Sequence, residues 1–468
     1  MKTLLIHPPA GRMIPSILPD EVESGRGHNP PLGLLYIAGS LRNRGGHEVG
    51  IIDAQAEGIG YEELEKRISN AAPDVVGITA LSFTMPDVLS VCAMAKKAGA
   101  TTVLGGPHAH IFSEETALLD NVDYAMRGEC EKTFCDLMDR ISEKSPPVNV
   151  PGATWSENGS VLSGPEPCFI DDLDELPHPA RDMLDPTLYT SVLAITSPIT
   201  TAMSSRGCPY RCIFCDRPHL GRKFRYRSAG SVVDEIEECV GLGVRELLFY
   251  DDNFATDKNR AMEIAEEIIR RELDVIIDAR LRVTDLDTDL AEALRRAGCD
   301  RVHLGVESGD PDILKRLKKG ITLDDAVRAF DTARRAGLRS LAYFMIGSPG
   351  ETRETASRTV DFARKLKPDY VHFSLLIPFP GTELYGEGVE RGMWNGDPWL
   401  EFALEPREDF VPPVWDENLD RNQLAKLTLD AYRSFYRDPA YLLRRLRKVR
   451  SFDEVLRQAR AGLKIFRL

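Results

Sequence analysis

The sequence of 468 residues is too long for one ordinary hydrophobic core and indicates two or three domains. Its formal net charge of −14 argues against general nucleic-acid binding, which needs clustered Lys and Arg. No apolar run reaches the roughly 18 residues that span a bilayer, and the start, MKTLLIHPPA, lacks a signal-peptide core. Nine unevenly spaced cysteines therefore suggest reduced thiols in a cytoplasmic protein rather than a disulfide framework.

Short β-branched runs alternate with amphipathic stretches over residues 1–145, the pattern of a parallel sheet covered by helices on both faces. Five strands are expected within TLLIHPP, HEVGIIDA, DVVGITALS, TTVLGGPH and DYAMRGE. This pattern predicts a doubly wound, Rossmann-like α/β domain whose ligand lies at the carboxyl ends of the strands. HPPAGR follows the first strand in place of GxGxxG, so dinucleotide binding is not favoured.

The composition changes after the first domain. Residues 146–195 are richer in Pro, Asp and Gly and are interpreted as an ordered linker with a few short strands. Residues 196–395 resume the alternation with six strand-helix units, which predicts a partial (β/α)6 TIM-like barrel. Residues 396–468 lose the alternation and are expected to form a small helical extension.

The segment SSRGCPYRCIFC, after the first barrel strand, carries Cys208, Cys212 and Cys215. Three thiolates at this spacing can hold three irons of a [4Fe-4S] cube and leave the fourth iron without a protein ligand. A Zn²⁺ site is the alternative, since His219 would complete a Cys3His set. The next cysteine, Cys239, lies in a predicted amphipathic helix and is interpreted as an apolar packing residue.

This cysteine spacing, with Phe214 directly before the last cysteine, resembles the signature of the radical SAM superfamily. The resemblance implies that S-adenosylmethionine (SAM) binds the open iron through its amino and carboxylate groups. It also implies that an electron from the cluster cleaves SAM to a 5′-deoxyadenosyl radical, which makes the three cysteines catalytic. An external electron donor such as flavodoxin or ferredoxin would then be a partner.

Polar residues at the ends of later barrel strands match further parts of this family. By resemblance, Asp251, Asp252 and Asn253 would face the ammonium of SAM, although these residue types also begin helices. Arg280 would pair with the carboxylate of SAM, with a surface salt bridge as the alternative. The remaining expected SAM contacts are Glu307 and Ser308 near the ribose, Ile346 and Gly347 near the adenine, and Phe214 in the cysteine segment.

The amino-terminal segments PPLGLLYIAGSLRNRGG, GITALSFTM, GGPHAH and DYAMRGECEKTF resemble the cobalamin-binding domain of cobalamin-dependent radical SAM enzymes. The combined resemblance covers residues 1–395 and implies cobalamin as a second cofactor. The lower corrin face would contact Ser82, Phe83 and Thr84, and the displaced nucleotide tail would contact Gly105, Gly106, Pro107 and His108. His108 and His110 are not expected to bind cobalt, because the chain has no Asp-x-His-x-x-Gly motif, and GGPHAH also suits a simple tight turn.

The domain order resembles a subgroup that includes radical SAM methyltransferases and the anaerobic magnesium-protoporphyrin cyclase. The leading hypothesis is methylation of an unactivated carbon of a small-molecule or lipid-like substrate, because such a carbon offers no lone pair to SAM alone. The alternatives are oxidative cyclisation or rearrangement without methyl transfer, a methylthiotransferase, and a non-catalytic cobalamin sensor. The other six cysteines do not suggest the auxiliary cluster of a methylthiotransferase.

Basic residues concentrate in two places. The tail from Arg433 to Leu468 has eleven Lys or Arg against three acids, which predicts a helical cap with a solvated basic face. Contact with a membrane surface or an anionic substrate is the alternative. The segment GRKFRYRS resembles an extension after the cysteine loop in this subgroup, which implies that four basic residues face the substrate or the cobalamin domain: Arg222, Lys223, Arg225 and Arg227. A solvated loop is the alternative.

Overall fold

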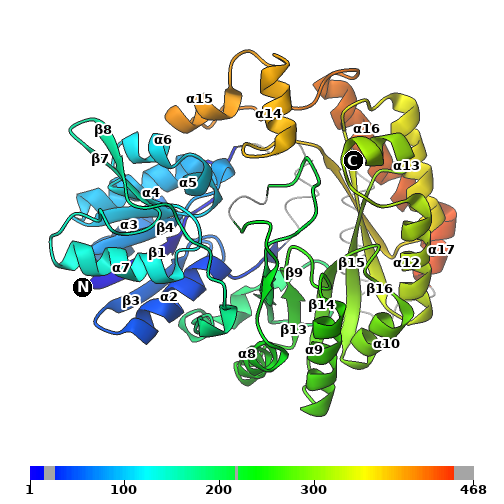
Figure 1. Cartoon of the computed structure of the whole chain (residues 1–468), viewed down its shortest axis with the longest axis horizontal. Helices are drawn as coiled ribbons and strands as arrows, with labels where there is room; N and C mark the ends of the chain where they lie inside the picture. Colours follow the sequence, from blue (N-terminus) through cyan, green and yellow to red (C-terminus); the bar gives the residue numbers. More distant parts are fainter. Residues whose placement is uncertain (15–26, 217–219, 447–468) are drawn as a thin grey trace.

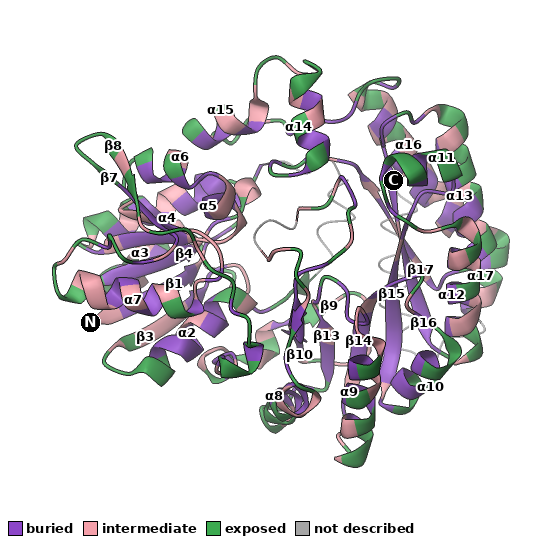
Figure 2. Ribbon diagram, in the orientation of Figure 1, coloured by how far each residue is buried: buried purple, intermediate pink, exposed green. Residues whose placement is uncertain are grey.

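The computed structural model describes residues 1–14, 27–216 and 220–446, which form two large β-sheets covered by helices (Figure 1). The first sheet belongs to the amino-terminal domain, drawn in blue and cyan, and the second curves into the half-barrel drawn from green to yellow. Helices α14 (Glu383–Glu390) and α15 (Pro398–Leu404) cross from the barrel to the amino-terminal domain. Both sheets are largely buried, whereas the outer faces of the helices are exposed (Figure 2).

The first sheet has seven strands in the described part of the chain, and its five predicted strands are all present and parallel. In spatial order the seven are β3 (Glu48–Asp53), β1 (Lys2–His7), β4 (Val75–Thr79), β5 (Thr101–Gly105), β6 (Tyr124–Met126), β7 (Ala153–Glu157) and β8 (Ser160–Ser163). Side chains alternate between two apolar layers, so Leu5 and Ile6 pack on opposite faces. One layer includes α2 (Leu32–Arg44) and α7 (Glu131–Ser142), and the other includes α3 (Tyr61–Ala71), α4 (Met85–Lys97), α5 (Pro107–Ile111) and α6 (Ser113–Leu118). The doubly wound prediction is confirmed.

Strands β7 and β8 form an antiparallel hairpin that extends the first sheet past residue 145. Its two-residue turn is Asn158 and Gly159, with φ of 51° and 76°. Positive φ at both positions matches the twist of the flanking strands, so Asn-Gly is a favoured hairpin turn. The hairpin supplies two of the few short strands expected within residues 146–195, and it joins them to the first sheet.

The second sheet has six parallel strands within the described residues, as the sequence predicts. In spatial order, which is also chain order, they are β10 (Ile199–Ala202), β13 (Glu246–Phe249), β14 (Ile276–Arg282), β15 (Cys299–Glu307), β16 (Arg339–Ile346) and β17 (Tyr370–Leu375). The helices between and beyond the strands are α8 (Ala229–Gly241), α9 (Lys258–Arg270), α10 (Thr288–Arg296), α11 (Pro311–Arg316), α12 (Leu323–Arg335) and α13 (Arg353–Leu366). The partial barrel is confirmed.

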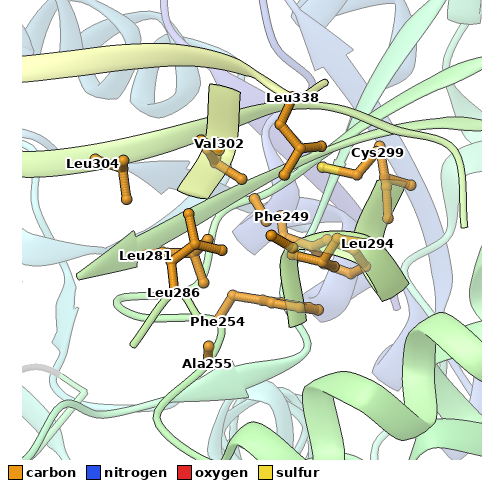
Figure 3. Close-up of a cluster of buried hydrophobic side chains, with 14 of the residues drawn as sticks. Phe249, Phe254, Ala255, Leu281, Leu286, Leu294, Cys299, Val302, Leu304 and Leu338 are labelled. Atoms are coloured by element: carbon orange, nitrogen blue, oxygen red, sulfur yellow. The ribbon is translucent and has the colours of Figure 1, made fainter. Parts of the chain in front are cut away.

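The apolar core of the half-barrel lies between its strands and the outer helices (Figure 3). Phe249, Val302 and Leu304 of the strands belong to one buried cluster with Leu294 of α10. Cys239 also lies in this cluster, which confirms it as a packing residue. Because side chains alternate along a strand, the residues between the core residues face the barrel interior.

The chain after the barrel is helical, as expected. Helices α16 (Arg421–Tyr436) and α17 (Pro439–Leu446) pack beside the last strand, where Tyr436 Oη donates to the Val371 carbonyl oxygen at 2.9 Å. A two-stranded pairing of β2 (Gly27–His28) with β9 (Thr190–Ser191) joins the amino-terminal domain to residues 146–195. Most of the predicted basic tail, residues 447–468, lies outside the described residues. Over the described ranges, the helices are all too short or too polar to cross a bilayer.

Candidate active site

A short β-ladder closes the loop that carries the three cysteines. Strands β11 (Ser205–Arg206) and β12 (Arg225–Tyr226) pair antiparallel, with Arg206 opposite Arg225, and we call this pair the neck of the cysteine loop, residues 207–224. Gly207 follows the neck with φ of 83°, and a Cβ there would lie 2.3 Å from the Lys223 carbonyl oxygen. Only glycine fits this close approach of two chain segments, so the loop geometry depends on it.

The cysteine loop is anchored on the barrel through Ile213, which is buried among apolar residues of α11, β16 and α14. Its amide donates to the Leu317 carbonyl oxygen at 3.1 Å, and its carbonyl oxygen accepts from the Leu384 amide at 3.0 Å. Cys208 and Cys212 are buried, whereas Cys215 is exposed. Phe214, between Ile213 and Cys215, is half-buried against the same apolar cluster.

The donor set of this loop fits an iron–sulfur cluster. The Arg282 Nη1 atom lies 3.8 Å from Cys212 Sγ, and its guanidinium stacks over the Tyr210 ring at 3.6 Å. A cation beside thiolates stabilises their negative charge. Among the described residues, no three His, Cys, Asp or Glu side chains lie close enough together to hold a single metal ion. An iron–sulfur cluster does not need such a group, because each of its cysteines binds a different iron. His219, the fourth ligand of the zinc alternative, lies outside the described residues.

The two aspartates and the asparagine after β13 occupy three different environments. Asp251 is buried and accepts from the Ser204 amide at 2.8 Å and from the hydroxyls of Ser204 and Ser205 at 2.6 and 2.5 Å. Burial raises the pKa of this carboxyl group. Asn253 is buried and accepts from the Arg282 amide at 3.2 Å, whereas Asp252 is exposed. Helix α9 is capped by a later residue, Asp257, so the capping alternative does not account for these three.

Arg280 lies in the barrel interior beside an interdomain contact. Its guanidinium stacks over the Tyr250 ring at 3.9 Å, and its Nε atom is buried without a hydrogen-bond acceptor. The Tyr250 hydroxyl accepts from Asn29 Nδ2 at 3.0 Å, and Asn29 belongs to the amino-terminal domain. The surface salt bridge considered for Arg280 is therefore wrong, because the side chain faces an aromatic ring inside the barrel.

Glu307 ends β15 in a strained conformation and in a buried ion pair. Its φ is 73°, which is uncommon for a residue with a side chain, and Lys319 Nζ lies 2.6 Å from its Oε1 atom. Ser308 is buried, with its hydroxyl 3.2 Å from that of Thr359 and accepting from the Asp310 amide at 3.1 Å. The buried glutamate thus has the partner that its position requires, and that partner comes from a loop whose place was not predicted.

The strand end of β16 combines an apolar residue with a tight turn. Ile346 is fully buried, and Gly347 follows with φ of 93°. The amides of Gly347 and Ser348 donate to Glu351 Oε2 at 2.6 and 3.0 Å. Burial raises the pKa of Glu351 to about 7, so a carboxyl group near its titration point organises this turn.

Three aromatic or imidazole side chains in the barrel interior were not predicted. His303 Nε2 accepts from Arg301 Nε at 3.2 Å, so Nδ1 carries the proton and donates to Tyr343 Oη at 2.9 Å. Burial lowers the pKa of His303 to about 4, which keeps it neutral. The ring of His372 lies 5.7 Å from that of Tyr343. The two-residue spacing with Arg301 could have indicated an inward-facing His303, but not its partner on another strand.

An apolar cavity of about 270 Å³ opens at the carboxyl edge of the first sheet. Gly105, Gly106 and Pro107 line it, as do residues of β1, α2, β4 and α7 and three residues near or within the cysteine loop, Met203, Arg206 and Leu220. Gly106 has φ of 102°, so a side chain there would strain the turn at the rim of the cavity. An apolar cavity with a glycine-rich rim suits part of a bulky ring system such as cobalamin.

The other residues expected near cobalamin lie away from this cavity's lining. His108 is fully buried, its Nδ1 atom lies 3.0 Å from Ser82 Oγ, and its ring lies 6.4 Å from that of Phe402. Burial lowers the pKa of His108 to about 3. Phe83 makes an edge contact with Trp399 of α15 at 6.1 Å, and Thr84 is buried. The neighbouring residue His110, rather than His108, lines the cavity.

The basic residues after the cysteines divide into two kinds. Arg225 faces the amino-terminal domain and donates to both carboxylate oxygens of Glu129 at 2.7 Å. Arg227 is buried in an ion pair with Glu235 of α8. Arg222 and Lys223 are exposed, and Lys223 pairs with Asp171 at 2.6 Å. The solvated alternative thus holds for the first two residues and is wrong for the last two.

Comparisons with known proteins identify the family. A model of the radical SAM superfamily matches residues 203–363, and a model of the B12-binding domain matches residues 22–138. An uncharacterized methyltransferase of Pyrococcus horikoshii is 34% identical and covers 99% of this chain and 98% of its own length. The chain belongs to the cobalamin-dependent radical SAM enzymes, and its cofactors are a [4Fe-4S] cluster, SAM and cobalamin.

Two further similarities extend over most of the chain. The anaerobic magnesium-protoporphyrin IX monomethyl ester cyclase of Rubrivivax gelatinosus is 28% identical over 89% of this chain and 75% of its own length. The solved structure of the cobalamin-dependent SAM radical enzyme OxsB, with aqua-cobalamin and SAM bound, has a TM-score of 0.74 at 18% identity. It covers 99% of this chain and 72% of that chain, and it shares the fold.

Proposed function

We propose that this enzyme cleaves SAM reductively to a 5′-deoxyadenosyl radical and methylates an unactivated carbon of a small-molecule or lipid-like substrate. When bound, the cluster supplies the electron for SAM cleavage and cobalamin supplies the methyl group. The methyltransferase relative from Pyrococcus horikoshii supports methyl transfer. An unactivated carbon explains the need for both cofactors, because it is not a nucleophile that SAM alone would methylate.

The proposal rests on a place where the cysteine loop, the chain after β17 and helix α5 lie next to one another. A Cβ on Gly381, after β17, would lie 3.7 Å from Asp216 Oδ1 and 3.5 Å from Ile111 Cδ1. Asp216 follows Cys215, and Ile111 belongs to α5, which begins at the rim of the apolar cavity. The cysteine loop, the carboxyl edge of the barrel and the carboxyl edge of the first sheet therefore meet, which favours chemistry between the two cofactors.

The SAM-contacting residues remain part of the proposal. Arg280 is the side chain best suited to bind the SAM carboxylate, because its buried Nε atom has no hydrogen-bond acceptor among the described residues. Glu307 would accept from the ribose, and the backbone of Ile346 and Gly347 would contact the adenine. Asp252 would face the ammonium directly, whereas Asp251 and Asn253 would position the cysteine loop and Arg282 through their hydrogen bonds.

The cobalamin contacts are assigned in the same way. We propose that the apolar cavity takes the nucleotide tail, with Gly105, Gly106 and Pro107 at its rim. Ser82, Phe83 and Thr84 would lie under the corrin after β4, and His108 would act through its contact with Ser82 rather than on cobalt. An external donor such as flavodoxin or ferredoxin would reduce the cluster.

Transfer of label from the methyl group of SAM tests the proposal. Full-length enzyme is purified anaerobically, reconstituted with cluster and hydroxocobalamin, which carries no methyl group, and incubated with candidate substrates, reductant and SAM labelled at the methyl carbon. Label in the product together with 5′-deoxyadenosine supports C-methylation. Formation of 5′-deoxyadenosine with a product that never contains label would instead support oxidative cyclisation, which the cyclase relative favours as the second candidate.

A further inference from the structure

Two arginines at the neck of the cysteine loop are held by two glutamates of the amino-terminal domain. Arg225 forms a two-pronged contact with Glu129, and Arg206 pairs with Glu131 at 2.5 Å. None of these four described side chains is more than 8% exposed. Opening a buried ion pair leaves uncompensated charge, so the neck is firmly attached to that domain.

The same glutamates form part of the wall of the apolar cavity. Glu129 and Glu131 lie where β6 leads into α7, directly after Gly128, and all three residues line the cavity. Arg206 and Leu220, from the neck and from the cysteine loop itself, line it as well. Whatever fills this cavity therefore contacts both the glutamates and the loop that they hold.

Glu129 also contacts the chain at Ile170, which in turn contacts Arg225 of the neck. Its Oε2 atom accepts from the Ile170 amide at 2.8 Å, and Arg225 Nη1 donates to the Ile170 carbonyl oxygen at 2.6 Å. Arg225 Nη2 donates to the Leu220 carbonyl oxygen at 2.9 Å. One buried carboxylate thus holds an arginine that in turn holds the far end of the cysteine loop.

We propose that Glu129 is a positioning residue through which the occupant of the apolar cavity orders the cysteine loop. This inference rests on the proposed assignment of the cavity to cobalamin. The occupant fixes the cavity wall, the wall fixes Glu129 and Glu131, and these hold Arg225 and Arg206 at the two ends of the loop. Because coupling between two sites is reciprocal, cluster assembly would tighten cobalamin binding by the same factor.

Thiol alkylation of the full-length protein, free of cluster and cobalamin, tests this coupling without turnover. The rates at Cys208, Cys212 and Cys215 are measured by mass spectrometry, anaerobically and in the dark, with and without saturating methylcobalamin. We expect methylcobalamin to slow alkylation of these cysteines by about tenfold, within the usual range for coupled sites. Equal rates in the two conditions, with methylcobalamin shown to be bound, would overturn the proposal.

Two variants and a matched control locate the coupling. Arg225→Lys keeps the charge, loses the two-pronged contact and lies outside the cavity lining, so we expect it to bind methylcobalamin but lose the protection. Glu129→Gln keeps the size of the side chain and serves if Arg225→Lys does not fold. Asp171→Asn removes only the exposed pair with Lys223 of the same loop, and it should retain full protection. If folded Arg225→Lys or Glu129→Gln protein were protected as well as the wild type, the proposed role of Glu129 would be overturned.

The reverse direction gives an independent readout. The Kd for methylcobalamin is measured by absorbance before and after cluster reconstitution, and we expect it to fall by about tenfold in the wild type and to stay unchanged in Arg225→Lys. An equal decrease in both proteins would contradict the proposal. Neither readout uses substrate or methyl transfer, so failure of labelled methyl transfer and failure of this coupling are separate results.

Discussion

Lys319 Nζ lies 2.6 Å from Glu307 Oε1 in a buried ion pair at the end of β15. The same ammonium lies 6.0 Å from the centre of the Phe214 ring, in the cysteine loop. Glu307 lies at a strained strand end and is proposed to contact the ribose. Through Lys319 it is connected to the segment that carries the cysteines.

Removing the cation should destabilise the protein more than removing a neighbouring surface cation. Lys319→Met leaves a buried carboxylate unpaired, and we expect a loss of about 3 kcal/mol in unfolding free energy. Urea unfolding followed by circular dichroism measures it. Lys318→Met, which breaks only an exposed pair with Glu383, should cost less than about 1 kcal/mol. The double variant Lys319→Met/Glu307→Gln should recover most of the loss, and a double variant as unstable as the single one would contradict this reasoning.

Each loop cysteine should be required for the cluster. Cys208→Ala, Cys212→Ala and Cys215→Ala are expected to lose the broad iron–sulfur absorbance after anaerobic reconstitution and to form no 5′-deoxyadenosine above background, because an iron corner loses its thiolate. Cys239→Ala is the matched control, since this cysteine lies in the barrel core, and it should retain both signals. A loop variant that cleaves SAM at the wild-type rate would show that the cluster lies elsewhere.

Glu351 should make stability depend on pH near neutrality. Burial raises the pKa of Glu351 to about 7, above the unfolded value of about 4.3. The protonated carboxyl group therefore favours the folded state below about pH 4.3, and this stabilisation is lost as the pH rises through about 7. Between about pH 5 and 8 the wild type should lose up to about 3 kcal/mol more than Glu351→Gln, measured by urea unfolding at each pH. Parallel pH profiles would refute the shifted titration.

Trp399 should hold the carboxyl-terminal segment on the amino-terminal domain. It is fully buried, contacts Phe83, Phe402 and Phe410, and donates from Nε1 to the Pro378 carbonyl oxygen at 2.9 Å. Trp399→Ala should cost about 3–5 kcal/mol through the cavity that it leaves. Leu404→Ala, at an exposed position of the same helix, should change stability by less than about 0.5 kcal/mol. Similar thermal midpoints for the two variants would exclude this anchoring role.

The basic tail can be tested without disturbing the barrel. Tyr436 and Tyr441 pack beside the last strands, so a chain that ends at Leu446 keeps these contacts, whereas one ending near Tyr432 would lose them. If residues 447–468 bind anionic lipid, full-length protein should pellet with vesicles containing phosphatidylglycerol and the shortened chain should remain in the supernatant. Equal pelleting of the two proteins would assign any binding to another surface.

The sequence allowed prediction of what depends on local pattern. Alternating apolar runs predicted both sheets, because each strand buries one face or two against helices, and the spacing of Cys208, Cys212 and Cys215 predicted a cluster loop within one short segment. Gly106 at the cavity rim was also predictable, since two glycines after a strand suit a turn with positive φ.

Contacts between distant segments were not predictable. The sequence indicated that Glu307 needs a partner, but Lys319 reaches it from a loop whose position depends on packing of α11. Arg225 looked like one of four similar basic residues, and only its distance to Glu129, 96 residues earlier, separates it from exposed Arg222. His108 was expected beside the nucleotide tail because GGPH resembles a cobalamin-binding segment, yet the helical turn directs its side chain into an aromatic cluster.

The amino-terminal domain contacts the rest of the chain in several places, and two of these contacts involve well-separated parts of the sequence. One is the ion-paired neck at Arg206 and Arg225, which follows the first barrel strand, and the other is the aromatic contact of Phe83 with Trp399, which follows the last barrel strand. A domain attached at one place can rotate about a hinge, whereas contacts at separate places restrict such a rotation. We therefore expect substrate to enter and leave through movement of loops rather than through separation of the two domains.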